Sequence, residues 1–156
     1  KTIESDMRNY YAEEERIIAL DKAKKELNSR KSKEIWGYND CWQFVVEYDK
    51  ALNGDKSRLQ DLDLNYDSPI SWEVQIKKLF RNYEVFASYT NYEIVKNKKP
   101  KTGDVAYQIM NDGNISALIA DKSHWVTATG DNGVIRAAQK MFLERNLPLI
   151  VRPIRD

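Results

Sequence analysis

The stretch Trp36-Gly37-Tyr38-Asn39-Asp40-Cys41-Trp42-Gln43-Phe44-Val45 decides how the whole chain is interpreted. Asp40 is a favourable helix N-cap, because its side chain can accept hydrogen bonds from the free N–H groups of a first helical turn. From Cys41 to Leu52 the apolar residues recur at intervals of three and four, and Asn53-Gly54 then supplies a helix stop. This pattern predicts a helix that buries one face and carries Cys41 in its first turn.

The chain has one cysteine, Cys41, and one histidine, His124. The dipole and the free N–H groups at a helix N terminus favour a thiolate and lower the pKa of a thiol, so Cys41 is a candidate nucleophile. A cysteine peptidase also needs an imidazole within hydrogen-bond reach and a group that orients that ring. The alternative is that Cys41 is a small buried apolar residue, which is the common fate of a free cysteine. Both interpretations fit the residues around it.

The first part of the chain, from Lys1 to about Lys33, is highly charged and contains neither Gly nor Pro. Its apolar residues recur at loosely helical intervals, which predicts a long amphipathic helix over residues 1–33. One interpretation places this helix outside the compact core, as an arm that docks on a partner. In the other, the helix packs across its own domain and exposes a charged face to solvent.

The rest of the chain, residues 34–156, changes from helical to β-like patterns. Pro69 and Ser71 open a predicted third helix that ends near Tyr83. From about residue 102, short β-like runs alternate with turn residues, and we expect strands at 104–110, 115–120, 125–129, 134–138 and 149–153. Helices followed by an antiparallel meander predict an α+β domain in which the helices cover one face of a five-stranded sheet.

Composition excludes several classes of protein. A length of 156 residues suits one domain, and 25 basic against 24 acidic residues leave no overall field that would attract nucleic acid. One cysteine and one histidine exclude an internal disulfide and a cysteine-rich zinc site, and Asp61-x-Asp63 lacks the glycine of a calcium loop. No apolar run approaches the roughly 18 residues of a membrane span. We therefore expect no metal, no cofactor, no nucleic-acid partner and no membrane span.

Three segments together resemble a known family. The stretch around Asp40-Cys41, the run Pro100-Lys101-Thr102-Gly103-Asp104-Val105-Ala106 and a hairpin that ends in Gly133-Val134 are similar to the NlpC-type superfamily of papain-like cell-wall cysteine peptidases. The resemblance covers roughly residues 35–153. It implies an NlpC-type papain-like fold, with the cysteine-bearing helix packed on the antiparallel sheet.

The closest resemblance is to small phage and prophage proteins that carry a Trp-Gly-x-Asn-Asp-Cys start and are often encoded among tail genes. It implies a structural protein of a tailed-phage virion, in the tail, tail tip or neck, that is made in the bacterial cytoplasm. Its partners would be other virion proteins, contacted through the N-terminal helix. Peptides of peptidoglycan are a further possible ligand of such a fold.

The resemblance also implies where a catalytic histidine would stand. In active relatives it opens the strand after the Gly-Asp-Val strand, which places it here at Ile115, or at Asn114 or Ser116 if the register differs by one; the orienting residue falls near Thr127. None of these is an imidazole. If 115–120 pairs with 124–129, His124 lies beside Ile119 or Ala120, on the order of 13 Å from the expected position. That distance favours a catalytically degenerate peptidase fold.

The alternative is an active peptidase or amidase that cleaves the stem peptides of peptidoglycan. In that hypothesis Cys41 is the nucleophile, His124 is the base, and Asp40 or Thr127 orients the imidazole. The backbone amide of Cys41 would be among the donors that stabilise the oxyanion.

Overall fold

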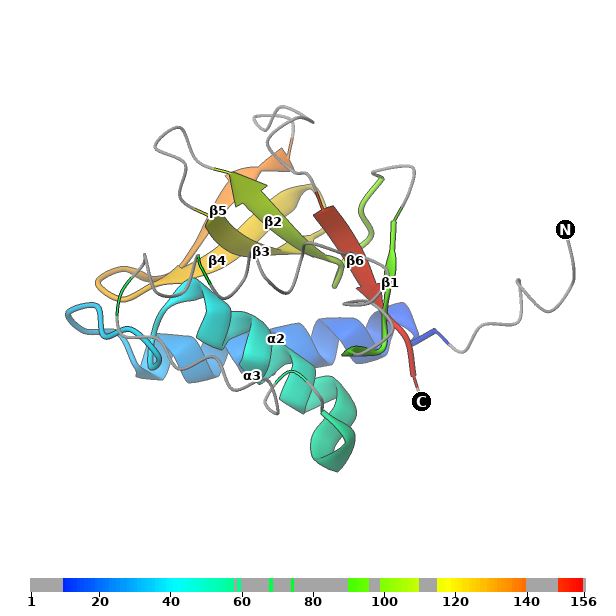
Figure 1. The fold of residues 1–156 in the computed structure, drawn as a ribbon, viewed down its shortest axis with the longest axis horizontal. Coiled ribbons are helices and arrows are strands. Elements are labelled where there is room, and N and C mark those ends of the chain that lie inside the picture. The colour runs from blue at the N-terminus through cyan, green and yellow to red at the C-terminus, as the bar shows by residue number, and fades with distance from the viewer. Residues whose placement is uncertain are drawn as a thin grey trace, which may run out of the picture.

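The computed structural model describes residues 10–57, 59, 68, 74, 90–95, 99–109, 115–139 and 149–155. Its elements are two α-helices, a short 3₁₀ turn and six strands: α2 (Glu13–Ser29), α3 (Cys41–Asn53), η1 (Gly54–Lys56), β1 (Tyr92–Ile94), β2 (Val105–Ile109), β3 (Ile115–Asp121), β4 (His124–Thr129), β5 (Gly133–Ala138) and β6 (Leu149–Pro153). The strands form one antiparallel sheet in the order β1-β6-β2-β3-β4-β5. The α2 and α3 helices run side by side along one face of this sheet (Figure 1).

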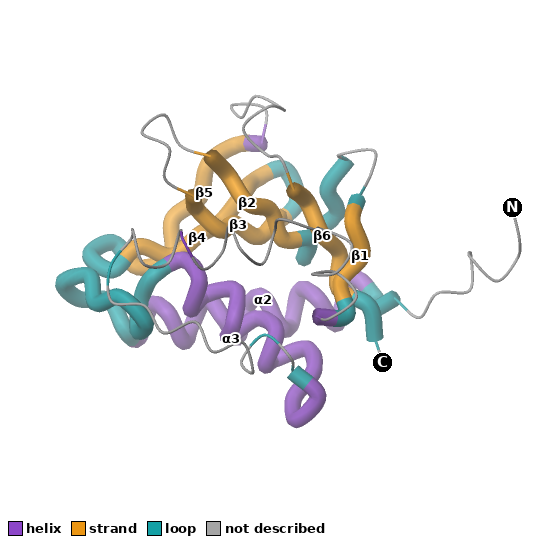
Figure 2. Tube along the Cα trace, in the orientation of Figure 1, coloured by secondary structure: helices purple, strands orange, loops and turns teal. Residues whose placement is uncertain are grey.

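The predicted α+β class is confirmed, and each of the five predicted strands is present as β2 to β6. A sixth strand, β1, was missed because its three residues are too few to show an alternating pattern. It lies at the edge of the sheet and pairs with β6 (Figure 2). The predicted helix from Pro69 and Ser71 to Tyr83 falls almost wholly outside the described residues.

Within the described residues, the predicted N-terminal helix is present as α2, Glu13–Ser29, and the part of the prediction that covers residues 1–9 lies outside the described residues. Tyr10 forms a β-bridge with Ile154 near the C-terminal end of the described chain, and Ala12 is extended. The Glu15 carboxylate accepts a hydrogen bond from the Ala12 N–H at 2.8 Å and so closes the first turn. Residues 10–12 are not helical, and the sequence pattern did not show this because a bridge to a residue far along the chain leaves no local pattern.

The inner face of α2 is part of the common core. Ala19, Leu20, Ala23 and Leu27 are each at most 2% exposed and belong to the same cluster as the side chains of α3. The two alanines allow close approach of the helices. Ile18, by contrast, is 50% exposed. Over Glu13–Ser29 the helix therefore packs across its own domain.

The sheet buries both of its faces to different extents. The helix-facing side contributes Ala117, Ile119, Val126 and Ala128 to the cluster that holds Trp42, Phe44 and Tyr48 of α3. The opposite side carries a smaller cluster: Val95, Ala106, Leu118, Ala120, Trp125 and Ile150. Successive residues of β3 and β4 alternate between these clusters, as the pleat requires. This alternation determines which side chains face the N terminus of α3.

Among the described residues, no helix is both long enough and apolar enough to cross a membrane.

Candidate functional site

The N terminus of α3 is capped as predicted. The Asp40 side chain accepts hydrogen bonds from the N–H groups of Trp42 at 3.0 Å and Gln43 at 3.1 Å, and its second oxygen accepts the N–H of Gly37 at 2.6 Å. Asp40 is 1% exposed. The carboxylate thus takes up N–H groups of the first turn that would otherwise be available to stabilise a negative charge on Cys41.

The surroundings of Cys41, a partly exposed residue, disfavour ionisation of its thiol. Burial, followed by the negative charges of Asp40 and Glu34, raises the pKa of the Cys41 thiol to about 12. The N–H of Ala117, which lies 3.5 Å from Sγ, opposes this shift without overcoming it. The expectation of a lowered thiol pKa was wrong, because it considered the helix N terminus without the charge of its cap and without the packing around the sulfur.

The residue of β3 whose backbone contacts the thiol is Ala117. Its N–H donates to the sulfur of Cys41, and its side chain is completely buried in the helix-side core. Ile115, where the resemblance implies a catalytic histidine, lies two residues before Ala117 on the same strand. The side chain of Ala117 cannot accept or donate a proton.

Thr127 lies near this point but faces differently. Its neighbours Val126 and Ala128 belong to the helix-side core, so the Thr127 side chain leans toward the other face, where its partner Ile135 is 43% exposed. The Thr127 Oγ1 donates to the carbonyl of Ala117 at 2.7 Å. Thr127 therefore serves the backbone of β3 and is not directed at an imidazole.

The backbone of Ala117 explains why Cys41 and Thr127 meet there. The β3–β4 pairing comprises three residue pairs, from Ile119–Val126 to Asp121–His124, and Ala117 lies beyond them. Its N–H and carbonyl are satisfied instead by the Cys41 sulfur and the Thr127 hydroxyl. A buried backbone group without a partner costs about 1–3 kcal/mol, so both side chains have a structural role at this point.

His124 lies at the other end of the hairpin. It pairs with Asp121, four residues along β3 from Ala117, which corresponds to about 13 Å of strand. The expected pairing with Ile119 or Ala120 was wrong by at least one residue. The Nδ1 atom lies 3.3 Å from Ser123 Oγ, and the His124 carbonyl accepts a hydrogen bond from the Gln139 side chain at 3.1 Å. The imidazole of His124, the only histidine in the sequence, therefore lies at the β3–β4 turn and far from the Cys41 thiol.

The Gly103-Asp104 segment also makes structural contacts. Gly103 has a φ of +93°, and a Cβ there would lie 2.5 Å from the Tyr48 hydroxyl. That hydroxyl donates to the Gly103 carbonyl at 2.8 Å. Asp104, which is 0% exposed, accepts two hydrogen bonds from Arg152 at 2.9 and 2.8 Å. The segment anchors the start of β2 to α3 and to β6.

Two further polar groups were missed by sequence reasoning. Asp49 is completely buried, and its carboxylate accepts hydrogen bonds from Asn53 and Tyr92, each at 2.9 Å, and from Ser57. Burial raises the pKa of this carboxyl. The network ties α3 to β1, and no local signal could reveal it because Tyr92 is 43 residues away.

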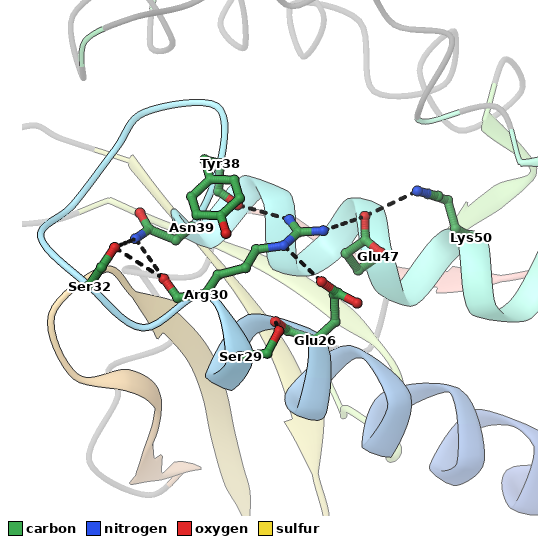
Figure 3. A network of polar contacts seen from close by, with 8 residues as sticks. All are labelled: Glu26, Ser29, Arg30, Ser32, Tyr38, Asn39, Glu47 and Lys50. Atoms are coloured by element: carbon green, nitrogen blue, oxygen red, sulfur yellow. Dashed lines mark hydrogen bonds and ion pairs between the residues drawn. The ribbon is translucent and has the colours of Figure 1, made fainter.

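The second is the loop between α2 and α3. Arg30 bonds to Glu26 at 3.0 Å, lies 3.4 Å from Glu47, and donates to the Tyr38 carbonyl at 2.8 Å (Figure 3). The Asn39 amide donates to the carbonyls of Arg30 and Lys33 and to the Ser32 hydroxyl. The sequence indicated only a turn-rich approach to the helix. These contacts fix the loop in one conformation.

The chain matches no family model, no curated protein and no solved structure. Within the described part of the chain, no group of three or more His, Cys, Asp or Glu side chains lies close enough together to hold a metal ion.

Proposed function

We propose that this protein is a structural component of a tailed-phage virion, in the tail, tail tip or neck, built on an NlpC-like cysteine-peptidase fold whose catalytic site is degenerate. The phage setting comes from the resemblance of residues 35–153. The structural role is supported by the geometry around Cys41.

The observation that carries the proposal is the setting of the thiol. The Cys41 sulfur contacts the backbone N–H of Ala117, and the pKa of the thiol is raised by burial and by Asp40. His124 pairs with Asp121 at the far end of the hairpin. General-base catalysis requires heavy atoms within about 3 Å of one another or one bridging water, and this arrangement does not provide it.

The residues that carry the resemblance have structural partners in this chain. Asp40 caps α3, and Asp104 holds Arg152. Such contacts preserve the shape of a fold independently of catalysis. A chain that retains these contacts and lacks the base is suited to present a surface to neighbouring subunits, with the outward side of α2 among the parts available.

The first experiment measures activity. Purified protein is incubated with peptidoglycan, and soluble stem peptides are measured by mass spectrometry beside the Cys41→Ala variant as control. We expect no release from either protein. Release by the native chain that Cys41→Ala abolishes would replace this proposal with the active peptidase in which Cys41 is the nucleophile and His124 the base.

The second experiment measures location. Particles of the phage that encodes the chain are purified on a density gradient, and the chain is quantified against the major tail and capsid proteins. We expect a fixed copy number per particle that does not fall in a Cys41→Ser phage. A chain that is absent from purified particles contradicts the proposal.

A further inference from the structure

The two ends of α2 carry opposite exposed charges. Glu13 and Glu14 lie exposed in the first turn, whereas Lys31 and Lys33 lie exposed in the loop just after the last turn. Among the residues that the structure describes, none of these four side chains forms an ion pair. Their neighbours do: Glu15 pairs with Arg155, and Arg30 lies between Glu26 and Glu47. Two glutamates at one end of α2 and two lysines at the other thus have no salt-bridge partner among the described residues.

The basic end also exposes apolar side chains. Ile35 is 53% exposed and Tyr38 is 44% exposed, and both belong to the loop whose backbone is held by hydrogen bonds from Arg30 and to Asn39. The Arg30 guanidinium stacks over the Tyr38 ring at 5.3 Å. Because the loop is already ordered, binding through it costs little conformational entropy. Glu34 is the one exposed acid among these residues and leaves the loop basic overall.

The acidic end carries an apolar side chain as well. Ile18 is 50% exposed and follows Glu14 by four residues, so the two lie on the same side of the helix. The next exposed charges, Asp21 and Lys22, cancel each other. The acidic end is therefore complementary to the loop in charge. It presents Ile18 beside two carboxylates, whereas the loop presents Ile35 and Tyr38 beside two lysines.

One copy of the chain cannot bring these surfaces together. The helix between them has 17 residues and is about 25 Å long. We propose that the loop surface of one copy, formed by Lys31, Lys33, Ile35 and Tyr38, docks on the acidic end of α2 of a second copy, formed by Glu13, Glu14 and Ile18. A contact between two different surfaces is head-to-tail, and repetition of it gives a closed ring or an open filament. This inference rests on the proposed function and names the partner as another copy of the chain.

The test is a charge exchange followed by analytical ultracentrifugation at low and high salt. The native chain should self-associate at low salt and dissociate as salt screens the charges. Lys31→Glu with Lys33→Glu, and separately Glu13→Lys with Glu14→Lys, should each weaken association by at least about tenfold. The chain with all four changes should recover it, because the complementarity is restored with reversed sign.

Apolar variants supply the matched control. Tyr38→Ala should weaken association, whereas Ile135→Ser should not, because Ile135 is similarly exposed at 43% but lies on the outer side of the sheet. Circular dichroism establishes that each variant is folded. The proposal would be overturned if the native chain stays monomeric at low salt. It would also be overturned if neither pair of charge reversals weakens association, or if the variant with all four changes is folded but stays monomeric. None of these results bears on the presence of the chain in particles, which tests the proposed function separately.

Discussion

The two ends of strand β4 offer a direct comparison. Near one end, Cys41 and Thr127 both bond to the backbone of Ala117, in a part of the sheet where the β3–β4 ladder is open. At the other end, His124 sits beside the turn and contacts Ser123 and Gln139. Cys41 on α3 and His124 on β4 thus each make local structural contacts. The comparison teaches that residue types suited to catalysis acquire chemistry only through their neighbours.

The neighbour that matters most to the thiol is Asp40. The same carboxylate that makes α3 begin at Cys41 raises the pKa of the thiol, second only to burial. An N-cap and a thiolate compete for the same N–H groups and repel each other. Asp40 therefore opposes ionisation of the thiol while it caps the helix, and changes at Asp40 should have the largest effects.

Asp40→Ala should lower the free energy of unfolding by about 2 kcal/mol, because a buried cap that accepts three hydrogen bonds is lost. Asp40→Asn should cost less, since its oxygen can still accept from the first turn. Both changes remove a negative charge and should lower the pKa of the Cys41 thiol. Urea unfolding measures the first effect, and the pH dependence of iodoacetamide alkylation measures the second. An unchanged alkylation profile in Asp40→Asn would mean that Asp40 does not govern the thiol.

The pH dependence of the free energy of unfolding should reveal the contribution of the Cys41 thiol. Because the pKa of Cys41 is raised to about 12 in the folded chain, the unfolded chain loses this proton first as the pH rises. The thiol's contribution to stability is therefore complete below the unfolded pKa near 8.5 and is lost above it, by up to about 1.4 kcal/mol per pH unit. Urea unfolding at pH 8, 9 and 10 should show this decline in the native chain relative to Cys41→Ser. If the free energy of unfolding changes with pH in the same way in both proteins, the pKa of the Cys41 thiol is not raised in the folded chain.

Much of the framework follows from local patterns, and the site does not. The Asp40 cap and five strands were predictable because each depends on residues within one element. The contact between the Cys41 sulfur and the Ala117 backbone was not predictable, because it depends on how α3 packs on a strand 76 residues further along the chain. The raised thiol pKa depends on burial, which no spacing rule reports. The three-residue β1 is held by pairing with β6 and carries no pattern of its own.

The Thr127 hydroxyl should contribute more to the free energy of unfolding than the Thr129 hydroxyl of the same strand. Thr127→Val removes the 2.7 Å donor to the Ala117 carbonyl and should cost about 1 kcal/mol. Thr129→Val is the matched control, because Thr129 makes only a 3.4 Å contact with the Gly133 carbonyl and should cost a few tenths of a kcal/mol. Thermal or urea unfolding distinguishes the two. Equal losses would show that the open part of the ladder does not depend on Thr127.

The smallest effect is expected at the imidazole. His124 is half-buried, and within the described part of the chain the one polar contact of its ring is with the neighbouring Ser123 hydroxyl at a long 3.3 Å. The hydrogen bond from Gln139 to the His124 carbonyl survives any change of side chain. His124→Ala should therefore change the free energy of unfolding by about 0.5 kcal/mol or less. It should also leave the alkylation rate of Cys41 unchanged at every pH, because about 13 Å of strand separates His124 from the residue that faces the thiol. If His124→Ala instead slowed alkylation in the native chain, the imidazole would be acting on the thiol, and the two ends of β4 would form one site.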